Sequence, residues 1–75
     1  LRLRTSLKEE IEILLNAQCK LEAEASQIYL AMASWLDRNG FEKSAGDLYE
    51  QAEEEREHFL KIFKYITEVG GTAIT

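Results

Sequence analysis

The chain contains no proline, and this absence constrains its fold more than any other feature of the sequence. Proline ends or kinks a helix, because its ring removes a backbone donor and clashes with the preceding turn. With 75 residues and only four glycines, the sequence favours long, uninterrupted helices over a loop-rich fold. The length is that of one small domain, so we expect residues 1–75 to form a single domain.

A first helix is predicted over about residues 7–38. Ser6 and Glu9 have the spacing of a capping box, in which each residue satisfies a free backbone donor at the start of a helix. Helical periodicity of the apolar residues then continues without a break until residue 38.

A turn at 39–41 separates this helix from a second one over about 42–69. Asn39 and Gly40 both tolerate the left-handed conformation that ends a helix. A glycine pair ends the second helix and opens a tail at 70–75. The predicted fold is therefore all-α, a long antiparallel helical hairpin with helices of roughly 30 residues, each about 40–50 Å long.

Both helices carry wide apolar stripes. In the first helix the stripe follows two neighbouring lines: Ile11, Leu15, Gln18, Glu22, Ala25, Tyr29, Met32 and Leu36, and beside them Leu14, Leu21, Ile28 and Trp35. In the second helix the line is Phe41, Ala45, Leu48, Ala52, Glu55, Phe59, Ile62, Ile66 and Val69. Two helices alone would leave part of such stripes exposed to water, so we expect a four-helix bundle. A second copy, or a further part of the chain, would supply the missing helix pair.

Three polar residues on or beside these stripes are predicted to meet at one level. Glu22 lies 18 residues before Gly40, Glu55 lies 15 residues after it, and His58 lies 18 residues after it. Residues equally far from the turn of an antiparallel hairpin lie side by side. Glu22, Glu55 and His58 should therefore converge near the middle of the bundle.

A metal ion would explain why two acids and a histidine occupy such positions. Buried carboxylates without a partner are disfavoured, and neighbouring carboxylates repel each other. Oxygen ligands with one imidazole suit iron or manganese, and zinc can substitute. Di-iron bundles take one Glu from each of two helices and a Glu-x-x-His from each of the others, so this hairpin carries half of that set. The alternative is a solvated Glu and an ordinary surface or core histidine, in a metal-free hairpin that only dimerises or docks on a partner helix.

The charge and cysteine content exclude several other classes of protein. The net charge of −5 disfavours a nucleic-acid partner, and no apolar run is long enough to cross a membrane. A single cysteine, Cys19, excludes an internal disulfide framework and a cysteine-built zinc site. It fits a reducing compartment, and we expect a cytoplasmic protein.

Motifs in both helices resemble those of non-haem ferritins. In the first helix they are Leu15-Asn16-Ala17-Gln18, Leu21-Glu22, Ser26, Tyr29-Leu30 and Met32. In the second helix they are Gln51-Ala52-Glu53-Glu54-Glu55-Arg56-Glu57-His58, Tyr65-Ile66 and Gly70-Gly71. The resemblance covers about residues 8–71 and implies that the hairpin is half of a ferritin-like four-helix bundle.

The resemblance also implies an activity, the oxidation of Fe(II) to Fe(III) by dioxygen or peroxide at a di-iron centre, with the product stored as mineral. Glu22, Glu55 and His58 would be metal ligands, with Glu55 bridging the two irons. Tyr29 matches the family tyrosine beside the centre, which can hydrogen-bond a ligand or give up an electron. Glu54 matches an acid that in some bacterial ferritins helps to hold a third iron. We interpret Gln18 as a support for a ligand or as a polar contact within the bundle.

The sequence departs from this family by stopping after the second helix, which leaves two alternatives open. In the first alternative, the chain, which begins at Leu1 rather than Met, is part of a longer ferritin. Otherwise it is a complete hairpin that self-associates, as do the two-helix ferritin-like proteins of encapsulin shells. The motifs favour the first alternative. Both imply a homo-oligomer, from a dimer up to a ferritin cage. A rubrerythrin-type protein is disfavoured, because one cysteine cannot supply a rubredoxin-like domain.

Overall fold

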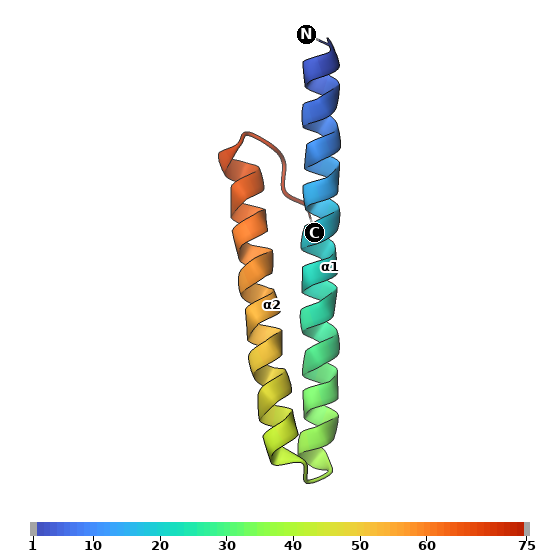
Figure 1. The fold of residues 1–75 in the computed structure, drawn as a ribbon, viewed down its shortest axis with the longest axis vertical. Helices are drawn as coiled ribbons and strands as arrows, with labels where there is room; N and C mark the ends of the chain where they lie inside the picture. Colours follow the sequence, from blue (N-terminus) through green and yellow to red (C-terminus); the bar gives the residue numbers. More distant parts are fainter. Residues whose placement is uncertain (1, 75) are drawn as a thin grey trace.

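The computed structural model describes residues 2–74, with side chains from residue 8 onward. It contains two antiparallel helices, α1 over Arg2–Arg38 and α2 over Glu42–Glu68, and the first turns of α1 extend beyond the end of α2 (Figure 1). The molecule is a rod measuring 59 × 15 × 13 Å. The predicted all-α antiparallel hairpin is thus confirmed. Neither helix in the described part of the chain has an apolar stretch long enough to span a bilayer.

The start of α1 differs from the predicted one. The helix begins at Arg2, so Ser6 lies inside it and does not cap a helix that starts at residue 7. The preceding residues Leu3 and Arg4 are good helix formers, and nothing in this stretch breaks the helix. A capping-box pattern therefore shows where a helix can begin, and the residues before it decide whether the helix extends further toward the N-terminus.

Both helices end in the same glycine-based motif. At the end of α1, Gly40 has φ +86°, and the Phe41 N–H donates to the carbonyl of Leu36 at 2.9 Å. At the end of α2, Gly70 has φ +83°, and the Gly71 N–H donates to the carbonyl of Ile66 at 2.9 Å. These are Schellman motifs, in which a left-handed glycine lets the chain turn back and satisfy the last free carbonyls. The turn predicted after residue 38 is thus built by local backbone chemistry.

The contact between the helices is made mainly by small residues. Cys19 and Ala33 of α1, with Ala45 and Ala52 of α2, are almost completely buried. The Ser26 hydroxyl donates to the carbonyl of Ala52 at 3.0 Å. Small side chains allow the helix backbones to approach closely enough for such bonds. The line in α1 that contains Cys19 and Ser26 was not part of the predicted stripe.

The predicted stripe of α1 is instead largely exposed. Six large apolar side chains on its two lines are between 49% and 68% exposed: Ile11, Leu14, Leu21, Ile28, Met32 and Trp35. Trp35 of the α1 stripe is therefore uncovered in the hairpin, whereas Phe59 of the α2 stripe is half-buried. Soluble domains rarely leave extended apolar patches in water. The exposure agrees with the expectation that two helices cannot cover stripes of this width.

The segment after α2 turns back and is bound to α1 (Figure 1). The Asn16 side-chain amide donates to the carbonyl of Thr72 at 2.9 Å and accepts from the N–H of Ile74 at 2.8 Å. The Thr72 N–H donates to the carboxylate of Glu12 at 2.9 Å. Residues 72–74 are therefore bound to α1 by three hydrogen bonds.

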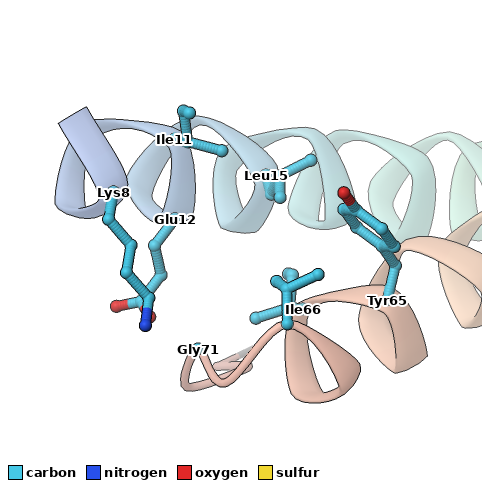
Figure 2. A pocket seen from close by; sticks show the side chains of 8 residues that line it. Lys8, Ile11, Glu12, Leu15, Tyr65, Ile66 and Gly71 are labelled. Carbon is cyan, nitrogen blue, oxygen red and sulfur yellow. The ribbon is translucent and has the colours of Figure 1, made fainter. Parts of the chain in front are cut away.

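A groove of about 390 Å³ lies between the helices beside this segment (Figure 2). Figure 2 shows Lys8 and Glu12 reaching from α1 toward Gly71, while Tyr65 and Ile66 approach from α2. The apolar lining comes from both helices, with Ile11 and Leu15 from α1 and Ile66 from α2. The groove is thus formed by both helices together with the segment that follows α2.

Candidate metal centre

Three side chains from the two helices converge near the middle of the hairpin. Glu22 comes from α1, while Glu55 and His58 come from successive turns of α2. His58 Nδ1 lies 3.8 Å from Glu22 Oε2 and 3.9 Å from Glu55 Oε2. One ligand atom from each residue lies within 4.8 Å of the other two. The structure thus brings together the three residues whose distances from the turn predict a common level.

The spacing of these atoms fits a single transition-metal ion. Carboxylate oxygens and imidazole nitrogens bind such ions at about 2.0–2.2 Å, so two ligand atoms of one ion lie at most about 4.4 Å apart. Both distances from His58 Nδ1 are within this limit. All three ligand atoms lie within 4.8 Å of one another. The donor set of two carboxylates and one imidazole is suited to iron and manganese, and also to zinc.

The two acids are sheltered, and the histidine faces the open side of the hairpin. The side chains of Glu22 and Glu55 are 16% and 17% exposed, whereas that of His58 is 56% exposed. The carboxylates are thus partly withdrawn from water, which strengthens their attraction for a cation. An ion held by them would still be accessible to ligands from another pair of helices.

The two carboxylates perturb each other in opposite directions. A hydrogen bond from Glu55, which outweighs the opposing effect of burial, lowers the pKa of Glu22 below its usual value. The same hydrogen bond, together with burial and the charge of Glu22, raises the pKa of Glu55. As the pH falls, Glu55 is therefore the first of the two acids to take up a proton. A metal ion would take the place of this proton, because it satisfies both oxygens at once.

A further side chain touches the centre from α1. The Gln18 side-chain amide donates to Glu22 Oε1 at 2.9 Å. The other oxygen of that carboxylate, Oε2, is the one that faces His58. The two oxygens of Glu22 therefore have different partners.

Comparison with known proteins places the chain in a family. The model of the ferritin-like domain matches residues 12–75, which is most of the chain. The chain belongs to the ferritin-like family. The expected resemblance to ferritins is thus confirmed.

Curated relatives of this ferritin-like chain share about 40% of its residues. A probable bacterial non-heme ferritin-like protein of Haemophilus influenzae is 43% identical over 68 residues, covering 91% of this chain and 41% of the relative. A bacterial non-heme ferritin of Staphylococcus epidermidis is 40% identical with the same coverage. One of Escherichia coli O6:H1 is 38% identical over 64 residues, or 85% of this chain and 39% of the relative. The chain thus spans about two-fifths of the length of the curated relatives it matches. No solved structure matches it significantly.

Two other residues predicted near the centre of the ferritin-like chain lie outside this cluster. Tyr29 is half-buried, two helical turns after Glu22 on the same line of α1. Glu54 is exposed, and within residues 8–74 the metal-binding group consists of Glu22, Glu55 and His58 without it. The roles suggested for Tyr29 and Glu54 stay predictions.

Sequence reasoning missed the polar contacts between α1 and the segment after α2. Asn16 and Glu12 bind the backbone of residues 72–74, more than fifty positions away in the sequence. Nothing in the spacing of these residues indicates such a contact, because their partners are main-chain groups that carry no side-chain signature.

Proposed function

We propose that this ferritin-like chain provides half of a di-iron ferroxidase centre, which oxidises Fe(II) to Fe(III) for storage. Glu22, Glu55 and His58 would bind the iron substrate, and a second helix pair would supply the other ligands. The observation that carries this proposal is the meeting of these three donors, from two helices, at distances suited to one metal ion. The relatives named non-heme ferritin give independent support.

Glu55 is the best candidate to bridge two irons. Its carboxylate lies 3.9 Å from His58 and belongs to the same cluster as Glu22. One of its oxygens could bind the ion held by Glu22 and His58, and the second oxygen would then be free for a neighbouring ion. Two ions bridged in this way lie close enough for one oxidant molecule to contact both.

The proposed ligands favour the oxidation of Fe(II) over the reverse reaction. Each Fe(II) gives up one electron, so two irons reduce one dioxygen, with two protons, to hydrogen peroxide. Anionic carboxylates stabilise Fe(III) more than Fe(II), which lowers the reduction potential and favours oxidation. The net charge of −5 would also attract Fe²⁺ toward the protein, an effect that salt should weaken.

The second helix pair comes either from a further segment of the same polypeptide or from a second copy of the hairpin. The uncovered apolar side chains of α1, from Leu14 to Trp35, support the presence of such a pair. Intact mass combined with solution mass separates the two sources. A chain of about twice this length in a very large assembly indicates an ordinary ferritin, whereas a dimer of this chain indicates a centre completed by the second subunit.

Fe(II) oxidation by the protein expressed from its complete gene tests the proposal. We expect about two Fe per four-helix unit and oxidation faster than in buffer, both abolished by Glu55→Ala or His58→Ala. Glu53→Ala is the matched control, because Glu53 is exposed on α2 close to Glu55 and lies outside the cluster. Unchanged oxidation in both ligand variants would rule out a ferroxidase centre at these residues.

A metal-free dimerisation module is the competing function. The exposed apolar face of α1 supports it as well as it supports a ferroxidase, because both functions require a partner that covers this face. In that case no metal binds, and Glu22→Leu is neutral or stabilising, because it removes a half-buried acid that lacks a cation. In a ferroxidase the same substitution abolishes iron binding. Metal content and thermal stability of this single variant therefore separate the two functions.

A further inference from the structure

Gln18 has a defined geometric relation to the candidate centre. It lies one turn before Glu22 on α1, and at this spacing two side chains are neighbours on a helix surface. Its Nε2 donates to Glu22 Oε1 at 2.9 Å, whereas Glu22 Oε2 lies 3.8 Å from His58 Nδ1. The hydrogen bond therefore occupies the oxygen that faces away from the imidazole.

A carboxylate needs such a restraint if it is to bind through one chosen oxygen. The terminal torsion of a glutamate is broad, so its two oxygens exchange places easily. A hydrogen bond to an ionised carboxylate is stronger than one between neutral groups, and it ties one oxygen to a fixed donor. The other oxygen is then left for a cation. Partners that orient ligands in this way strengthen metal binding, although they never touch the metal.

We propose that Gln18 is a positioning residue, which holds Glu22 so that the carboxylate binds metal through Oε2 alone. This inference rests on the proposed function, because it concerns the same centre. The alternative is a simple surface contact between neighbours on a helix, which contributes little to stability and nothing to metal binding.

Substitution of Gln18 by methionine separates these roles. Gln18→Met keeps a side chain of similar length and removes the donor. Gln27→Met is the matched control, because Gln27 is also exposed on α1 but lies about 140° around the helix from Glu22. Both variants are made in the protein expressed from its complete gene. Co(II) is the probe, since its visible absorption bands report the number and geometry of its ligands.

We expect Gln18→Met to bind Co(II) about 10–100-fold more weakly than the parent protein, which is the usual effect of losing a partner of a metal ligand. Its Co(II) spectrum should also change, because Glu22 is free to bind through both oxygens. Gln27→Met should match the parent in affinity and spectrum. Without metal, both variants should unfold at nearly the parent temperature.

A second variant guards against a failure of Gln18→Met to fold. Gln18→Glu keeps the shape of the side chain but, once ionised, cannot donate to Glu22, so its Co(II) spectrum should also differ from that of the parent. Parent-like affinity and spectrum in Gln18→Met, or a parent-like spectrum in Gln18→Glu, would overturn the positioning role and leave the proposed function intact. Failure of the parent protein itself to bind Co(II) would instead remove the proposed function, and this inference with it.

Discussion

The side-chain amide of Asn16 binds the backbone of Ile74, accepting its N–H at 2.8 Å, while the same amide donates to Thr72. One residue of α1 thereby holds two positions of the segment that follows α2. Glu12 completes the contact by accepting the N–H of Thr72. The end of α2 and the first half of α1 are thus joined by polar groups as well as by apolar packing.

Replacing Asn16 should release this segment in a residue-specific way. In Asn16→Ala the Ile74 amide loses its acceptor and should exchange with solvent faster, whereas the Thr72 amide keeps Glu12. In Glu12→Ala the Thr72 amide should exchange faster, whereas the Ile74 amide keeps Asn16 as its acceptor. Each exposed hydrogen bond contributes roughly 0.5–1.5 kcal/mol at most, so global stability should fall only slightly. Hydrogen exchange measured by NMR at the two amides tests this, and equal acceleration at both sites in both variants would contradict it.

Alanine substitutions at Gly71 and Gly46 should change the free energy of unfolding in opposite directions. A Cβ on Gly71 would lie 2.6 Å from Glu12 Oε1 and 3.1 Å from the backbone oxygen of Ile66. Gly71→Ala should therefore destabilise the hairpin by about 1–3 kcal/mol, as overpacking usually does. A Cβ on Gly46, inside α2, meets nothing within 4 Å, so Gly46→Ala should stabilise by about 0.5–1 kcal/mol. Urea unfolding of both variants provides the comparison, and a stable Gly71→Ala would show that the loop readily moves aside.

Cys19 should make stability depend on pH in the alkaline range. Burial, and then the charge of Glu22, raises the pKa of this thiol above its ordinary value of 9.0. The unfolded chain thus loses the thiol proton before the folded chain does. The contribution of the neutral thiol is complete below about pH 9 and is lost as pH rises through the folded pKa.

The comparison of the parent protein with Cys19→Ala isolates this effect from other groups that titrate in the same range. The difference in unfolding free energy between them should shrink as the pH increases from 8 to 11, a range chosen around the ordinary thiol value of 9.0. If this difference stays constant or grows as the pH increases, ionisation of the Cys19 thiol does not contribute to the pH dependence of stability. In agreement with complete burial, the thiol should also react with alkylating reagents only when the chain opens.

Metal binding should release a proton from the acid pair. The hydrogen bond with Glu22, followed by burial, raises the pKa of Glu55, so this acid keeps its proton above the ordinary value of 4.5. Between that value and the raised pKa, a metal ion must displace the proton, and affinity should increase with pH. Calorimetric titration with Zn(II) in two buffers of different ionisation enthalpy measures the protons released. If the parent protein releases no proton just above pH 4.5, or if Glu55→Gln releases as many protons as the parent, Glu55 is not the source of the proton.

Much of the hairpin follows from local sequence, because its decisive features involve neighbouring residues. A left-handed glycine at residue 40 ends α1 through hydrogen bonds that reach back only a few positions. Once that turn is placed, the antiparallel arrangement fixes which residues share a level. The convergence of Glu22, Glu55 and His58 could therefore be predicted by counting from the turn.

Which face of α1 meets α2 was decided only by the tertiary structure. Apolar periodicity predicted a wide stripe on two neighbouring lines of α1. The line of Leu14, Leu21 and Ile28 is exposed, and the other line is only half-buried at positions such as Leu15 and Ala25. The line of Cys19 and Ser26, which was not predicted, contains the buried contact with α2. Apolar periodicity shows only where hydrophobic residues recur along a helix. Close packing of two helices also depends on how their side chains fit together, and here small side chains on both helices allow the close approach. The binding of Thr72 by Asn16 was hidden for a related reason: it joins residues 56 positions apart through a main-chain group.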